Sequence, residues 1–106
     1  MALDDVRIYT GTLVADLILG SARSLKERRA PLRSLVQKLH NRNLGVAQVG
    51  PADLHQRVFL AITTVGSTET QVEEQLAGAE RVLFASEFEV GELRRDINVD
   101  SFASER

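Results

Sequence analysis

The fold is decided by residues 6–19, which read VRIYTGTLVADLIL, and by the break that follows them. β-Branched and aliphatic residues dominate this stretch, which is typical of a strand. Alternation at period two puts its side chains on opposite faces: Leu13, Ala15 and Leu17 on one, and Val14, Asp16 and Ile18 on the other. Gly20-Ser21 ends the pattern. The sequence therefore predicts one long amphipathic strand near the start of the chain.

A helix is predicted directly after this strand. Ser24 and Glu27 have the spacing of a capping box, which supplies partners for the free backbone N–H groups of a first turn. The apolar positions that follow recur at helical spacing: Leu25, Leu32, Leu35, Val36 and Leu39. Pro31 lies within this pattern, where proline removes a hydrogen bond and costs about 3 kcal/mol. We expect a kink near residues 27–31; the alternative is a helix that starts later, with Pro31 in its first turn.

The remaining elements complete a recognisable order. A short strand is predicted over residues 46–49, a turn over residues 50–53, and a further strand over residues 57–65. Thr68 and Gln71 open a second helix, whose apolar stripe is Val72, Leu76, Ala79 and Leu83. A last strand is predicted over residues 87–97, with a bulge near Gly91 where the alternation changes face. The order β-α-β-β-α-β predicts an α+β ferredoxin-like plait, a four-stranded antiparallel sheet with two helices on one face.

Length and composition bear on the number of domains, the location of the protein and the ligands it could bind. The chain of 106 residues is predicted to be one domain with a core over residues 6–98 and loose tails at 1–5 and 99–106. It has no cysteine, no apolar run long enough to span a bilayer, and no signal-peptide pattern at its start, so we expect a cytoplasmic protein without membrane partners. His40 and His55 are predicted at opposite ends of the sheet. We therefore expect no metal site and no cofactor.

Charge is unevenly distributed along the chain. Residues 21–42 contain seven of the thirteen Lys and Arg residues and one acid, whereas residues 69–106 carry ten acids and four basic residues. The formal net charge of -2 therefore conceals a basic element and an acidic element.

The predicted topology brings two separate stretches together. The first helix starts where the first strand ends, and the turn between the second and third strands lies at the same end of the sheet. Residues 53–57, DLHQR, should thus lie near four basic side chains: Arg23, Lys26, Arg28 and Arg29. Arg28 falls within the apolar stripe of its helix, so it either reaches the sheet edge, pairs with Asp53, or awaits a ligand.

These residues favour nucleic acid over catalysis. No nucleophile motif or phosphate loop is present. His55 beside Asp53 is better explained by a histidine that caps the turn than by a base and its orienting acid. Guanidinium groups bind phosphate bidentately, and a helix start also attracts anions. An aromatic pair for stacking RNA bases is not visible on the exposed sheet face, where we expect Thr12, Val14, Ile18, Phe59 and Thr63. That partly apolar face equally suits a protein partner.

Several stretches resemble the YlxP-like family of small bacterial proteins of unknown function. The most specific is Ser24-Leu-Lys-Glu-Arg-Arg29 with Leu32, Ser34 and Leu35 after it; residues 46–49, 53–57 and 60–62 extend the likeness, which covers about residues 7–98. The resemblance implies a ferredoxin-like fold. Genes of this family often stand among those for transcription and translation factors, which implies a role near RNA or ribosome maturation. His55 stands where the family commonly has Trp, and Pro31 interrupts a helix that is usually unbroken.

Three functions follow as expectations. The leading one is a non-enzymatic accessory protein that binds RNA or a ribosomal subunit, with nucleic-acid contacts from Arg23, Lys26, Arg28, Arg29, Gln56 and Arg57. The second is a homodimeric interaction module that uses the open sheet face or an edge strand. The third is a small-anion-binding or hydrolytic site at the same end, with Asp53 and His55 as ligand-binding candidates.

Overall fold

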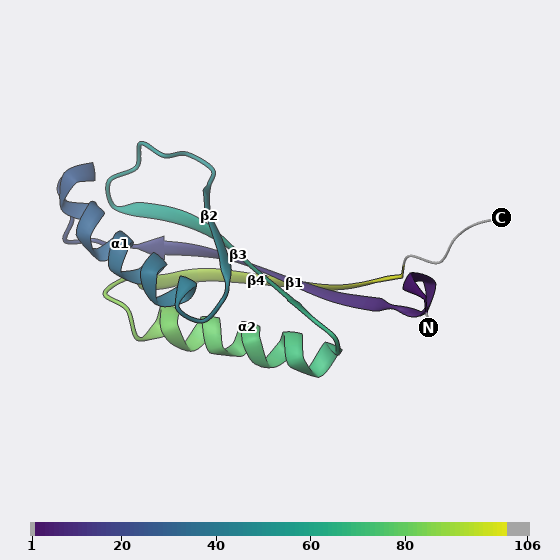
Figure 1. Cartoon of the computed structure of the whole chain (residues 1–106). Coiled ribbons are helices and arrows are strands. Elements are labelled where there is room, and N and C mark those ends of the chain that lie inside the picture. The colour runs from purple at the N-terminus through teal and green to yellow at the C-terminus, as the bar shows by residue number, and fades with distance from the viewer. Residues whose placement is uncertain (1, 102–106) are drawn as a thin grey trace.

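A computed structural model describes residues 2–101 of the chain. A short 3-10 helix, Leu3–Asp5, precedes six longer elements, shown in Figure 1. In chain order these are β1 Arg7–Ile18, α1 Leu25–His40, β2 Gly45–Val49, β3 Arg57–Gly66, α2 Glu69–Phe84 and β4 Glu89–Ser101.

The four strands form a single antiparallel sheet in the order β2-β3-β1-β4. β3 lies between β2 and β1 and pairs antiparallel with both, so β1 and β2 run parallel to one another. Both helices lie on the same side of this sheet in Figure 1. The predicted ferredoxin-like plait is thereby confirmed.

The core lies between the sheet and the helices. Alternate residues of β1 and β3 point into it, as Leu13 opposite Ile62 and Leu17 opposite Val58 illustrate; all four are fully buried. The predicted stripe of α2 is buried throughout: Val72, Leu76, Ala79 and Leu83. The other face of the sheet, called the open face below, has no helix over it in the described part of the chain.

The first helix differs from its prediction at one position. It begins at Leu25, directly after the N-cap Ser24, so Pro31 lies inside the helix and the later start is wrong. Leu35 and Leu39 are buried as expected, but Leu25 is exposed because the first turn of α1 extends beyond the sheet. The kink at Pro31 stays a prediction.

The last strand is longer than its sequence pattern indicates. β4 continues to Ser101 rather than ending at residue 97, because β1 offers it partners as far as Arg7. The register shift between Asp16 and Leu17 leaves Gly91 without a partner on β1 and so confirms the predicted bulge. The loose tail predicted over residues 99–106 is wrong for residues 99–101, which belong to β4, and residues 102–106 lie outside the described part of the chain. None of the described helices is long and apolar enough to cross a membrane.

Candidate nucleic-acid interface

The N-terminus of α1 is capped by side chains of residues 24 and 27. The Ser24 hydroxyl accepts a hydrogen bond from the Glu27 backbone N–H at 3.2 Å, and the Glu27 carboxylate accepts one from the Arg23 backbone N–H at 3.3 Å. The Ser24 half of the predicted capping box is thus present, whereas the Glu27 carboxylate accepts from Arg23, one residue before the N-cap, rather than from the Ser24 backbone N–H. Glu27 thus already supplies negative charge at the helix N-terminus, and phosphate binding there would depend on the surrounding cationic side chains rather than on the helix dipole.

Arg28 holds the loop between β2 and β3. Its guanidinium donates hydrogen bonds to the backbone carbonyls of Leu54 and Arg57, the latter at 2.9 Å, and a longer one to Ala52 at 3.5 Å. Arg28 is 6% exposed. These contacts decide among the three alternatives for Arg28: its guanidinium reaches the β2–β3 loop at the border of the sheet, it forms no ion pair with Asp53, and it does not lie at the surface where phosphate would reach it.

Two further hydrogen bonds join the same segments. The Leu19 backbone N–H donates to the Gln56 carbonyl at 2.8 Å, and the Gln56 side-chain amide donates to the Gly20 carbonyl at 3.2 Å. The loop over residues 50–56 is therefore attached both to the end of β1 and to α1. The expected convergence of the two stretches is present, although Gln56 is partly used in forming it.

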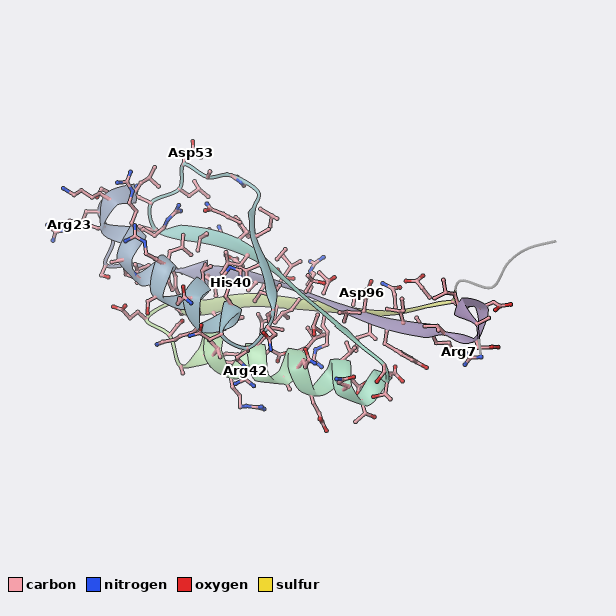
Figure 2. The ribbon with its side chains drawn as sticks, in the orientation of Figure 1. Arg7, Arg23, His40, Arg42, Asp53 and Asp96 are labelled. Atoms are coloured by element: carbon pink, nitrogen blue, oxygen red, sulfur yellow. The ribbon has the colours of Figure 1, made fainter. Side chains whose placement is uncertain are left out.

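Three basic residues at this end remain exposed. Arg23 stands immediately before the N-cap, and Lys26 and Arg29 lie in the first turns of α1. Figure 2 shows Arg23 and Asp53 at the same end of the molecule, with Asp96 and Arg7 toward the other. Asp53 and His55 are exposed on the loop. These three basic side chains, which we call the basic triad, are the part of the predicted cluster that can meet a large anionic partner.

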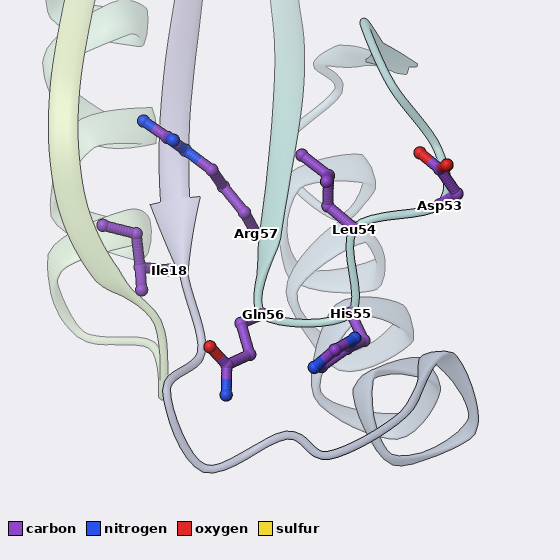
Figure 3. A pocket seen from close by; sticks show the side chains of 6 residues that line it. All are labelled: Ile18, Asp53, Leu54, His55, Gln56 and Arg57. Atoms are coloured by element: carbon purple, nitrogen blue, oxygen red, sulfur yellow. The ribbon is translucent and has the colours of Figure 1, made fainter.

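Arg57 points to the open face instead. Its side chain binds the Asp16 carboxylate through two hydrogen bonds, of 2.8 and 2.6 Å, and its guanidinium carbon lies 5.3 Å from the centre of the Phe59 ring. The hydrogen bond from Arg57 lowers the pKa of Asp16 below its usual range, against the opposing effect of partial burial. In Figure 3 the Arg57 side chain extends toward β1, away from His55. It is therefore separate from the basic triad.

A hollow of about 650 Å³ opens beside the loop. Its lining comes from the end of β1 and from residues 53–57: Ile18, Asp53, Leu54, His55, Gln56 and Arg57 (Figure 3). A smaller hollow of about 340 Å³ continues over the open face, between Phe59 and the Glu92–Arg94 ion pair. Arg57 borders both. The larger hollow is lined by the ligand candidates Asp53 and His55 together with the apolar side chains of Ile18 and Leu54.

Sequence reasoning missed two features of this region. The partners of Arg28 are backbone carbonyls, which every sequence provides and no motif marks. The Asp16–Arg57 pair links β1 to β3 diagonally, since Ile18 stands opposite Arg57 and Asp16 opposite Phe59. The sequence predicts a strand for each of these two residues, but the register that brings them together follows from the core packing of the whole sheet.

Comparison with known proteins identifies the family. A family model described as "Protein of unknown function (DUF503)" matches residues 10–95. The chain belongs to this family. It is also similar to the uncharacterized protein YlxP of Bacillus subtilis (strain 168), with 34% identity over 67 residues that span 62% of this chain and 73% of YlxP. The resemblance to the YlxP-like family is thereby confirmed.

Two solved structures of designed proteins are also similar. Ferredog-Diesel, a de novo designed protein, has 16% sequence identity and a TM-score of 0.45, with 82% of this chain and 83% of the designed chain covered. Foldit4, also designed de novo, has 5% identity and a TM-score of 0.40, with 91% and 98% covered.

Proposed function

We propose that this DUF503 protein is a non-enzymatic cytoplasmic accessory protein that binds RNA, either free or within a ribosomal subunit. The binding surface consists of the basic triad and the adjacent loop over residues 50–56. The observation that carries this proposal is the fixed placement of that loop beside the start of α1, through the hydrogen bonds of Arg28. Because the loop is held in place, little ordering would be required when a partner binds.

Charge supports an anionic partner at this end. Arg23, Lys26 and Arg29 are exposed, while the nearest acid in sequence, Glu27, is engaged in capping the helix. Lys and Arg side chains that neutralise phosphates release counterions, and this release supplies most of the affinity of non-specific nucleic-acid binding. The acids of the chain are most frequent on α2 and β4, and the loop itself carries one exposed acid, Asp53.

The open face is less suited to reading bases. Phe59 is the aromatic residue that the central strands, β1 and β3, present on the open face. The Arg57 guanidinium already lies near the Phe59 ring. RNA-binding sheets of the RRM type stack two or three bases on aromatic side chains. We therefore propose recognition of backbone phosphate and RNA shape, with His55 and Gln56 in supporting contacts.

The test is the salt dependence of binding to purified ribosomal RNA and ribosomal subunits. The variant Arg23→Ala/Lys26→Ala/Arg29→Ala removes the basic triad; the matched control Arg7→Ala/Lys38→Ala/Arg81→Ala removes three exposed positive charges elsewhere. On single-stranded RNA, loss of three phosphate contacts should reduce the slope of log K against log salt by about 2. The control should keep the wild-type slope.

Two results would contradict the proposal. One is an absence of binding by the wild-type protein at low salt. The other is an equal loss in both triple variants, which would mean that net charge, rather than this surface, governs the interaction.

The second candidate function is a homodimeric interaction module. Val14 and Val65 are exposed on the open face, which gives it some apolar surface. Covering the open face with a second copy would also remove the Arg57–Asp16 and Arg94–Glu92 ion pairs from water. The desolvation free energy of these charges is not fully offset by the attraction between the paired groups. Of the two surfaces expected from the sequence, the edge of the sheet is therefore the better one for a second copy.

A further inference from the structure

β4 presents a long free edge. It is the outermost strand in the order β2-β3-β1-β4, it has 13 residues, and β1 is its only partner among the described residues. Within residues 2–101, no backbone group of β4 makes a hydrogen bond to backbone outside its own sheet. The N–H and C=O groups on its outer side thus form a template for another strand.

Monomeric proteins usually protect such an edge, and β4 is poorly protected. Common devices are short edge strands, proline, bulges and charged side chains, lysine above all. The opposite edge, β2, has five residues and is followed by Gly50-Pro51. β4 contains neither proline nor lysine, and its charged residues carry both signs, which a partner strand can match. Its bulge at Gly91 lies near one end, so residues 92–101 continue in regular register.

We propose that β4 pairs antiparallel with β4 of a second copy, about a two-fold axis that passes through Arg95. Arg95 is the middle residue of Glu89–Ser101, so this axis allows the whole strand to overlap. Residues equally distant from Arg95 then face one another. Arg94 of each copy, which binds Glu92 in its own chain, then lies opposite Asp96 of the other copy and can bridge both acids. Leu93 lies opposite Ile97, so the register gives two ion pairs and two apolar pairs between the copies.

The two faces of the sheet agree with this register. Arg94 and Asp96 stand opposite Val14 and Thr12 of β1, on the open face. Leu93 and Ile97 are partly buried on the helix side, where they pack against the core. Ion pairs would form on the solvated side, and apolar contacts would extend the core on the other.

The two Arg95 residues that face one another at the axis each have an acidic partner. Each Arg95 already binds Glu80 of α2 in its own chain. Two arginines and two glutamates would therefore lie around the axis, and the charges balance.

Neighbouring registers are less favourable. An axis through Arg94 would place Glu92 opposite Asp96, and an axis through Asp96 would place Glu92 opposite Asp100, with like charges facing in both. Axes at Leu93 or Ile97 shorten the overlap to nine residues. The full-length register is thus the one that combines length with charge complementarity.

The test is the solution mass across a range of protein concentrations, by light scattering or sedimentation equilibrium. The wild-type protein should show twice the chain mass of 11.7 kDa. Arg94→Asp and Asp96→Arg should each raise the dimer dissociation constant at least about tenfold, because each places like charges at two symmetric positions. The double variant Arg94→Asp/Asp96→Arg should restore the wild-type value, with circular dichroism confirming that every variant is folded.

Val65→Asp, on the open face of β3, is the control and should leave the dimer unchanged. A wild-type monomer at all concentrations would overturn the proposal. So would a double variant that fails to regain dimerisation, or a dimer that dissociates with Val65→Asp but not with the β4 variants. None of these results depends on RNA, so this interface stands or falls separately from the proposed function.

Discussion

Arg28 shows what a single residue contributes and how far the sequence can describe it. Its place in the apolar stripe of α1 indicated that it could not be an ordinary surface arginine, and it is indeed buried. Its partners could not be predicted, since they are loop carbonyls positioned by the ends of two strands. A planar guanidinium with five donors can satisfy several carbonyls at once, which an ammonium group on a flexible stem does less well.

Replacement of Arg28 by alanine should destabilise the fold. The carbonyls of Leu54 and Arg57 would lose their donor in a partly buried region, at a cost of about 1–3 kcal/mol in the free energy of unfolding. Urea denaturation measures this change. Arg29→Ala removes the same charge from the adjacent exposed position and should change stability by no more than about 0.5 kcal/mol.

Hydrogen exchange separates the role of Arg28 from a general loss of stability. Amides of the loop over residues 50–56 should exchange faster in Arg28→Ala, while those of β1 and β3 keep their relative protection. Equal stability of the Arg28→Ala and Arg29→Ala variants would show that the loop does not depend on this side chain.

At the level of elements, most of the fold could be predicted because its signals are local. The capping residues Ser24 and Thr68 mark the helix starts, and their hydroxyls accept the expected backbone hydrogen bonds. Period-two alternation identified the central strands. The end of β4 could not be predicted, because residues 98–101 have little strand character of their own and are ordered by pairing with β1.

Gly11 controls how closely α2 approaches β1. A Cβ atom at this position would lie 2.5 Å from Val72 Cγ1 and 2.8 Å from Leu76 Cδ1, closer than such atoms can pack. Gly11→Ala should therefore destabilise the protein by about 1–3 kcal/mol, through overpacking of this contact. Thermal or urea unfolding measures the effect.

Gly20→Ala is the matched control, because a Cβ atom there meets no heavy atom within 4 Å. It should be neutral, or stabilise by up to about 1 kcal/mol through reduced freedom of the unfolded chain. If the two variants were equally stable, the contact between α2 and β1 would be looser than the structure shows.

At the level of the whole molecule, the two proposed surfaces lie at opposite edges of the sheet. The basic triad and the loop adjoin β2 and α1, whereas β4 forms the other edge. Pairing through β4 would give an eight-stranded sheet with the helices of both copies on one face. The acidic strand would then lie at the centre of the dimer, and the two basic ends would lie outermost. The basic and acidic segments of the sequence would thus be separated in space, at the ends and at the centre of the dimer.

This arrangement predicts that a dimer binds long RNA more tightly than a monomer does. Two linked basic surfaces convert the second contact into an intramolecular one, which raises overall affinity on the order of a hundredfold when both surfaces can engage one molecule. Binding of wild-type protein and of Arg94→Asp should therefore differ on long ribosomal RNA, at protein concentrations where only the former is dimeric. On an oligonucleotide too short to reach both surfaces, the two proteins should bind equally per chain, because the basic triad is intact in each. Equal affinity on the long RNA would mean that the two basic surfaces act independently, even if the dimer forms.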